Sequence, residues 1–123
     1  MKTILIIEDE EIMLDLLRYK INASGYRVLI SRNGEEAMVI LKKERPDLIV
    51  MDLLMPKMDG FSTMKEIQKD ESLKKIPLII ISNSGQPVEL DEAKKLGAID
   101  WLIKAEFDPQ ELIDKINFQL NQR

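Results

Sequence analysis

Five polar residues directly follow short apolar segments and could together perform phosphate chemistry. In chain order they are Glu8, Asp9, Asp52, Ser82 and Lys104. Three carboxylates a few ångströms apart repel one another unless a cation neutralises them, and oxygen ligands suit Mg²⁺. The Lys104 ammonium supplies a second positive charge, and the Ser82 hydroxyl supplies a hydrogen-bond donor. An aspartate in such surroundings is equipped to receive a phosphoryl group.

Five short apolar segments are predicted to be the strands that position these residues. They are rich in Ile, Leu and Val and mostly lack period-two alternation, which is typical of parallel strands covered on both faces. The last of them is the weakest, because it is brief and is placed by its context. The predicted strands span residues 3–7, 27–30, 48–51, 78–81 and 101–103.

Five amphipathic segments alternate with these strands and are predicted to be helices. Gly25 follows the first as a stop signal, and Asn33 and Asp108 begin capping boxes before the second and the last. Strict alternation of strands and helices predicts an α/β fold with a doubly wound parallel sheet. The predicted helices span residues 11–23, about 33–44, about 61–69, about 88–96 and about 109–120.

The predicted sheet brings the polar residues together. In an open sheet of this kind, ligands bind beyond the carboxyl ends of the strands, where the strand order reverses. If the first and third strands are neighbours, as in the order 2-1-3-4-5, the carboxylates of Glu8, Asp9 and Asp52 converge. Singly, an acidic residue after a strand more often only caps the next helix. The prediction therefore rests on all of these strand ends carrying complementary groups.

The composition excludes several other chemistries. The 123 residues include no cysteine and no histidine, which excludes disulfides, thiolate metal sites, the common zinc sites and Ser-His-Asp catalysis. The 18 basic residues are interspersed among 22 acidic ones, so we expect no nucleic-acid binding. No apolar segment is long enough for a membrane span or a signal peptide. We expect a cytoplasmic protein with one domain over residues 1–123 and no membrane partner.

Residues 52–60, with the sequence DLLMPKMDG, carry the sharpest likeness to a known family. Ser82 follows Asp52 by thirty positions, and Lys104 follows Ser82 by twenty-two. With the acidic pair after the first strand, the chain resembles the receiver domain of two-component response regulators over essentially its whole length. The resemblance implies a flavodoxin-like fold of five strands in the order 2-1-3-4-5 and five helices. It also implies a signalling switch of a phosphorelay and not an enzyme.

The resemblance implies a role for each residue of the phosphate site. Asp52 would accept a phosphoryl group from a histidine kinase or phosphotransfer protein, and Ser82 and Lys104 would bind the phosphoryl oxygens. Trp101 matches the family's aromatic switch position, usually Tyr or Phe, although ordinary packing would also explain an aromatic residue there. Phosphorylation would then alter the binding of a downstream protein that the sequence does not identify.

The resemblance also implies a magnesium site. Asp9, Asp52 and the backbone carbonyl of Leu54 would hold Mg²⁺ directly, and Glu8 would contribute through water. In the family, the positions of Leu54 and Ser84 tune how fast the aspartyl phosphate is hydrolysed. An apolar Leu54 cannot orient an attacking water, which favours a long-lived phosphoryl state.

Two residues beside the phosphate site depart from the family pattern. The family commonly has a proline after the lysine, with a cis bond between them, where this chain has Ala105. A cis bond before a non-proline residue costs about 2.5–4 kcal/mol, so we expect a trans bond and a re-routed loop before Asp108. The residue after Ser82 is usually small, and here Asn83 could crowd or hydrogen-bond the phosphoryl group.

Three other functions stay open on the same fold. Phosphatases of the haloacid dehalogenase type use an aspartate after a strand, but with another aspartate two residues later, where this chain has Leu54. Flavodoxins and dinucleotide-binding proteins need a loop rich in Ser, Thr or Gly after the first strand, whereas the acidic residues 8–11 would repel phosphate. A scaffold that works without phosphorylation is disfavoured by the intact set of site residues.

The sequence does not name the kinase or the pathway. In the family, kinase choice lies largely on the first helix and on the loop after the last strand, although a solvated or core-facing helix would look the same. We expect either a stand-alone regulator or the receiver of a longer protein. The candidate contacts on the first helix are Met13, Asp15, Leu16 and Arg18.

Overall fold

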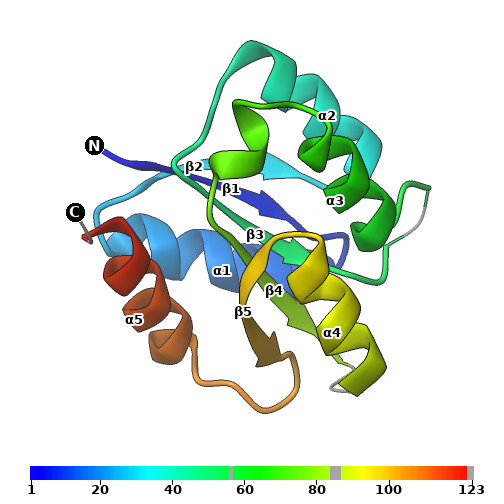
Figure 1. Ribbon diagram of the computed structural model, residues 1–123. Helices are drawn as coiled ribbons and strands as arrows, with labels where there is room; N and C mark the ends of the chain where they lie inside the picture. Colours follow the sequence, from blue (N-terminus) through cyan, green and yellow to red (C-terminus); the bar gives the residue numbers. More distant parts are fainter. Residues whose placement is uncertain (56, 84–86, 122–123) are drawn as a thin grey trace.

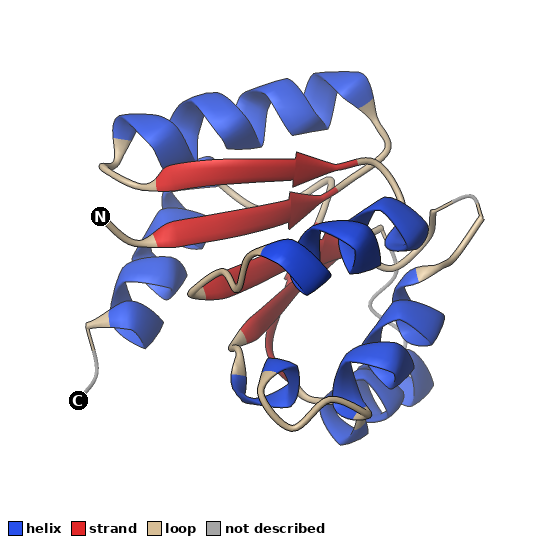
Figure 2. Ribbon diagram, turned by 90° about the horizontal axis from the view of Figure 1, so that it is seen from above, coloured by secondary structure: helices blue, strands red, loops and turns tan. Residues whose placement is uncertain are grey.

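A five-stranded parallel sheet forms the centre of the computed structural model, which describes residues 1–55, 57–83 and 87–121 (Figure 1). The strand order is β2-β1-β3-β4-β5, and neighbouring strands run parallel (Figure 2). This confirms the predicted fold class and strand order. The strands are β1 (Thr3–Ile7), β2 (Arg27–Ser31), β3 (Leu48–Asp52), β4 (Leu78–Ser82) and β5 (Ala98–Ile103).

Helices cover both faces of the sheet. Helices α1 and α5 lie on one face, and α2, α3 and α4 lie on the other (Figure 1). A short 3-10 helix, Leu73–Lys75, precedes β4 and was not predicted. None of the helices in the described part of the chain is long and apolar enough to cross a membrane. The helices are α1 (Glu11–Ala23), α2 (Gly34–Lys43), α3 (Gly60–Gln68), α4 (Pro87–Lys95) and α5 (Pro109–Leu120).

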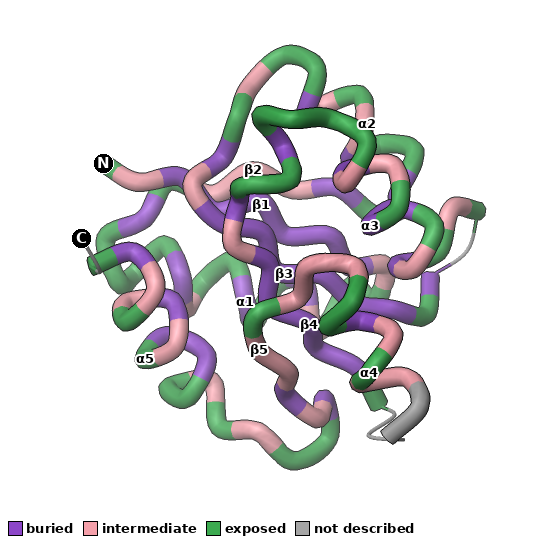
Figure 3. Tube along the Cα trace, in the orientation of Figure 1, coloured by how far each residue is buried: buried purple, intermediate pink, exposed green. Residues whose placement is uncertain are grey.

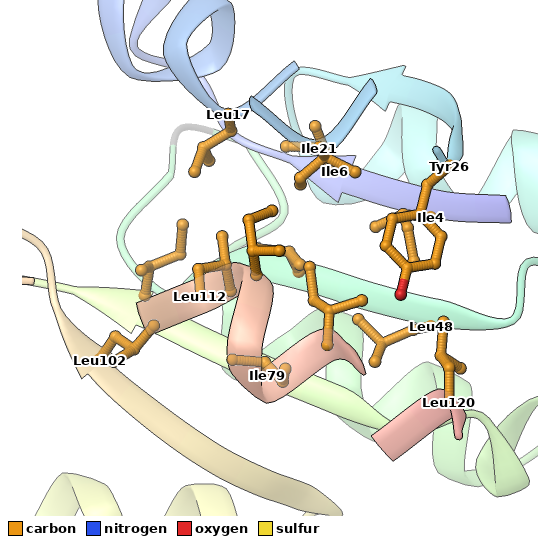
Figure 4. Close-up of a cluster of buried hydrophobic side chains, with 14 of the residues drawn as sticks. Ile4, Ile6, Leu17, Ile21, Tyr26, Leu48, Ile79, Leu102, Leu112 and Leu120 are labelled. Carbon is orange, nitrogen blue, oxygen red and sulfur yellow. The ribbon is translucent and has the colours of Figure 1, made fainter. Parts of the chain in front are cut away.

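Two apolar cores pack against the sheet, because successive side chains of a strand point to opposite faces. Ile4 and Ile6 of β1 belong to the core beneath α1 and α5 (Figure 4), and Leu5 and Ile7 belong to the core on the other face. All four side chains are fully buried, and Figure 3 shows burial concentrated along the strands. This two-sided burial is why the strands have continuous apolar sequences.

Local capping signals begin two helices where they were predicted. The Asn33 side chain accepts a hydrogen bond of 2.9 Å from the backbone N–H of Glu36. Asp108 and Glu111 form a complete capping box, with Pro109 in the first turn of α5. These contacts are short in sequence, so the sequence pattern alone is sufficient to predict them.

The last strand is longer than predicted. It begins at Ala98, three residues before the expected start at Trp101. Its pairing with β4 shifts register near the start, and it includes the charged Asp100, which lies 2.9 Å from the ammonium of Lys115 on α5. A charged residue and an irregular register remove the continuous apolar pattern by which the other strands are recognised.

The loop after β5 takes the predicted trans path. No peptide bond among the described residues is cis, so the bond between Lys104 and Ala105 is trans. The backbone N–H groups of Glu106 and Phe107 each donate a hydrogen bond of 3.0 Å to the carbonyl of Ile103. The chain therefore turns tightly after the lysine before it enters α5.

Gly60 holds the loop between β3 and α3 close to the sheet. Its N–H donates a hydrogen bond of 2.8 Å to the Leu53 carbonyl, and a Cβ at this position would lie 2.6 Å from the Leu53 Cα. Asp59 caps α3 by accepting a hydrogen bond of 2.8 Å from the N–H of Ser62. These contacts bring the start of α3 back against the end of β3, next to Asp52.

Replacing Gly60 with alanine is expected to lower the free energy of unfolding by about 1–3 kcal/mol, because the new methyl group overlaps backbone atoms. Urea unfolding followed by circular dichroism measures this change. Ser62→Ala, at an exposed position of the same helix, should change the stability by less than about 0.5 kcal/mol. Equal stability of Gly60→Ala and the wild type would contradict the close packing of this loop.

Candidate functional site

Three buried charged residues meet at the carboxyl edge of the sheet. Asp52 ends β3, Glu8 follows β1, and Lys104 follows β5. The Lys104 Nζ lies 3.0 Å from Asp52 Oδ2 and 2.9 Å from Glu8 Oε2. Lys104 is 8% exposed, Asp52 is 3% exposed and Glu8 is fully buried. They meet because β1 and β3 are neighbours at the point where the strand order reverses.

Ser82 and Asp9 lie at the same edge of the sheet. Ser82 ends β4 and is fully buried, and its carbonyl accepts a hydrogen bond of 2.7 Å from the N–H of Lys104. Asp9 is half-buried, and its charge acts on Asp52. The five polar residues singled out by the sequence are therefore gathered at one edge, while the roles assigned to them stay predictions.

Both carboxylate oxygens of Asp52 accept hydrogen bonds. Oδ2 accepts from Lys104, and Oδ1 accepts from the backbone N–H of Leu54 at 3.2 Å. The Leu54 side chain is 59% exposed, so an apolar group lies at the surface beside the carboxylate. Asn83 is also exposed, and Ser84 lies outside the described residues.

Glu10 is a member of the site that sequence reasoning missed. Its carboxylate forms an ion pair with the Lys104 ammonium, and carboxylate oxygens of Glu8, Glu10 and Asp52 lie within 4.8 Å of one another. Glu10 directly precedes α1, but its side chain does not cap that helix. The acidic run at residues 8–11 was the available signal. It does not tell which carboxylates turn towards the lysine.

The members of this acidic run have different partners. Two of the four bind Lys104, as described above, and Glu11 pairs with Arg32 at 3.0 Å. Asp9 has no ion pair within the part of the chain that the structure describes. Its carboxylate is therefore available to a cation from solution.

Burial is the main cause of the raised pKa values of the two buried carboxylates, Glu8 and Asp52. It raises the pKa of Glu8 to about 7, although hydrogen bonds from the Glu10 N–H and from Lys104 act in the opposite direction. Burial also raises the pKa of Asp52, and repulsion from Asp9 adds to this effect. Burial alone would lower the pKa of Lys104, but its hydrogen bonds to carboxylates outweigh this and raise the pKa. A single lysine thus leaves the negative charge of the site incompletely compensated.

One buried oxygen of the site lacks a hydrogen-bond partner within the described residues. This atom is Oε1 of Glu8, whereas Oε2 of the same residue accepts from Lys104 and from the N–H of Glu10. Buried polar atoms are normally satisfied by protein, water or an ion. The clustered carboxylates of Glu8, Glu10 and Asp52 offer oxygen atoms, which are the ligands that Mg²⁺ prefers. The residues present therefore fit a magnesium ion.

Trp101 lies away from the charged cluster, in an apolar groove of about 200 Å³ between α4 and β5. The half-buried indole packs against the core on the α4 side of the sheet. The predicted switch residue is thus on β5, three residues before Lys104, and faces the helix that follows Ser82. The apolar residues that line the groove with it are Leu90, Ala93, Ala98 and Ile99.

A comparison with known families matches residues 4–117 to the response regulator receiver domain. The chain belongs to this family. As a receiver domain, it is a component of two-component signalling. The match covers four of the five residues of β1, the other four strands and most of α5, so the family likeness includes the charged cluster.

Two relatives and one solved structure illustrate the likeness. The probable transcriptional regulator ycf27 of Porphyra purpurea is 34% identical over 97% of this chain and 47% of its own length. Protein PilH of Pseudomonas aeruginosa is 32% identical over 95% of this chain and 96% of its own length. The receiver domain thus spans about half the length of the ycf27 relatives it matches.

The solved structure is the receiver domain of the sensor histidine kinase PA1611 from Pseudomonas aeruginosa PAO1. It matches with a TM-score of 0.89 and 26% identity over 98% of both chains. That domain holds a magnesium ion coordinated in its active-site cleft.

The buried Glu8 makes the stability of the metal-free receiver domain depend on pH. Its pKa rises from 4.5 to about 7 in the folded state, so the folded state binds more protons than the unfolded state between these values. The free energy of unfolding therefore falls as the pH rises through this range. One pKa unit corresponds to about 1.4 kcal/mol, so a rise from 4.5 to about 7 corresponds to a loss of about 3.5 kcal/mol.

Urea unfolding in the presence of EDTA, repeated across this pH range, measures the effect. Glu8→Gln should flatten the dependence, because its side chain does not titrate. Glu35→Gln, at an exposed position of α2, should retain it. A dependence that persists unchanged in Glu8→Gln would show that Glu8 is not its source.

Proposed function

We propose that this receiver domain is a phosphoryl-accepting switch. Asp52 accepts a phosphoryl group from a histidine kinase or phosphotransfer protein in the presence of Mg²⁺, and the new charge state changes the binding of a downstream protein. The observation that carries the proposal is the contact of Lys104 with Asp52 and Glu8, at 3.0 and 2.9 Å. It places a cation directly beside a carboxylate that is oriented by hydrogen bonds on both oxygens.

The side chains of the site can assist the transfer by orientation and by charge. An oxygen of Asp52 attacks the phosphorus of the donor phosphohistidine, so that a P–O bond forms while the P–N bond breaks. The electron pair of the P–N bond returns to the imidazole. Hydrogen bonds from Lys104 and from the N–H of Leu54 hold the attacking carboxylate in place. The Lys104 ammonium and the Ser82 hydroxyl then bind oxygens of the transferred group.

Asp9, Asp52 and the carbonyl of Leu54 are the proposed direct ligands of Mg²⁺, with Glu8 acting through water. When bound, the ion neutralises charge on the carboxylates and on the transferred group. The missing partner of Glu8 Oε1 and the lack of an ion pair at Asp9 within the described residues support this assignment. A related protein also supports the assignment, because the PA1611 receiver domain holds a magnesium ion in its active-site cleft.

The proposed chemistry stops at the aspartyl phosphate and its hydrolysis, so the domain acts as a regulator and not as an enzyme on other substrates. The Leu54 side chain offers no polar group to orient an attacking water, and Leu54 is 59% exposed. We therefore propose a long-lived phosphoryl state. The exchange is proposed to occur in the cytoplasm. The domain itself is not proposed to bind nucleic acid, although the longer ycf27 relative is named as a transcriptional regulator.

The outer face of α1 is the proposed docking surface for the phosphoryl donor. Ile12, Leu16 and Tyr19 are 87%, 41% and 75% exposed. They recur at helical spacing along α1, starting at the end of the helix nearest the site. Of the contacts expected from the sequence, Leu16 belongs to this stripe, whereas Met13 packs against the core. Asp15 and Arg18 pair with each other on the surface.

Incubation with acetyl phosphate and Mg²⁺ should add one phosphoryl group to the wild type, detected by intact-mass analysis and removed by hydroxylamine. Asp52→Asn should gain none, because the nucleophilic carboxylate is lost. Asp59→Asn is the matched control in the same loop, since asparagine retains the cap of α3. It should be phosphorylated normally. A group that is still added to Asp52→Asn would mean that the acceptor is another residue.

Binding of beryllofluoride with Mg²⁺, a mimic of the acyl phosphate, should shift the fluorescence of Trp101. The reason is that Ser82 is drawn towards the mimic and the indole moves within its groove, which changes its contact with water. Asp52→Asn should show no shift, and Ser82→Ala should show a smaller one. If calorimetry detects binding while the emission stays constant, Trp101 is a packing residue and not a switch.

A further inference from the structure

The three carboxylates that hold Lys104 differ sharply in exposure. Glu8 is fully buried and Asp52 is 3% exposed, whereas the Glu10 side chain is 59% exposed. Glu10 stands immediately before α1, and its side chain makes no capping hydrogen bond to the helix. Its carboxylate is bound to Lys104 instead. The most exposed of the three carboxylates that bind Lys104 is thus one that does not also cap the helix.

An ammonium group has three N–H donors. In this structure the partners of Lys104 Nζ are Glu8, Asp52 and Glu10, so each donor has a carboxylate. A phosphoryl group on Asp52 brings new charged oxygens that need at least one of these donors. Glu8 sits at the end of a buried strand and cannot withdraw into solvent. Glu10 can, because more than half of its side chain is already exposed.

We propose that Glu10 is a positioning residue that competes with the phosphoryl group for the Lys104 ammonium. It holds the lysine in the unphosphorylated arrangement, and it must release the lysine when the acceptor is charged. This inference rests on the proposed function of Asp52 and Lys104 and adds a residue that limits how tightly the site holds a phosphoryl group. A role of Glu10 as a further magnesium ligand is the competing assignment, because its carboxylate lies within 4.8 Å of those of Glu8 and Asp52, and the experiment below separates the two roles.

The test is the affinity for beryllofluoride at saturating Mg²⁺, measured by calorimetry on the whole chain. Glu10→Gln should bind the mimic about two- to five-fold more tightly than the wild type, the range that corresponds to a partly exposed ion pair. This change removes no helix cap, because the Glu10 side chain makes no capping hydrogen bond.

Glu11→Gln is the matched control, because it removes the same charge from the next residue, which is 61% exposed and pairs with Arg32. Its affinity for the mimic should stay within about two-fold of the wild type. The Nζ resonance of Lys104 in the metal-free protein should shift in Glu10→Gln and stay in place in Glu11→Gln. That signal reports the ion pair directly and does not depend on phosphorylation.

Three results would overturn the role of Glu10. They are an unchanged or weaker affinity of Glu10→Gln for beryllofluoride, an equal gain in Glu11→Gln, and a weaker affinity of Glu10→Gln for Mg²⁺ alone. The last would make Glu10 a metal ligand. Failure of the proposed function has a different signature, because the wild type itself would then bind no beryllofluoride and gain no phosphoryl group at Asp52.

Discussion

The burial of Lys104 among carboxylates is the interaction on which the site depends. An ammonium that is 8% exposed and a glutamate that is fully buried are each unfavourable alone, because the low dielectric of the interior penalises an uncompensated charge. Together the opposite charges compensate each other, but one lysine does not neutralise all three carboxylates that it contacts. The raised pKa of Glu8 and the lone Oε1 of that residue both record a shortage of positive charge. A site in this condition responds strongly to any added cation or anion.

Packing of the apolar sheet brings these charged residues together, although burying them is electrostatically unfavourable. Lys104 is 96 residues from Glu8 and 52 residues from Asp52 along the chain, yet all three follow or end strands of one parallel sheet, in which β1 and β3 are buried on both faces. Backbone hydrogen bonding then ties the lysine to the end of β4 through the Ser82 carbonyl. The hydrophobic effect stabilises the sheet, and the strand order brings the charged residues together at one of its edges.

Strands β4 and β5 connect the charged edge of the sheet to an apolar groove. Ser82 ends β4, and Trp101 lies on the neighbouring β5, three residues before Lys104. The groove between α4 and β5 therefore lies on the strand that leads to Lys104, and that strand pairs with the one that ends at Ser82. A packed sheet resists continuous deformation. The coupling that we propose between Ser82 and Trp101 would run through these short, hydrogen-bonded segments.

The predictable part of this protein is the part set by local or repetitive patterns. Buried parallel strands appear as apolar runs, and the caps at Asn33 and Asp108 join residues two or three positions apart. The convergence of Asp52, Ser82 and Lys104 also follows, because parallel strands end at one edge. The start of β5 was missed, since Asp100 and an irregular register interrupt its apolar pattern.

Within the acidic run at residues 8–11, the sequence by itself determined only that negative charge gathers after β1. The tertiary structure decided which carboxylate binds which partner: Glu10 pairs with Lys104, Glu11 pairs with Arg32, and Asp9 has no ion pair among the described residues. The side-chain directions at the start of α1 are set by where the helix begins and by partners 21 and 94 residues away. Contacts of that range depend on the packed fold, so no local pattern contains them.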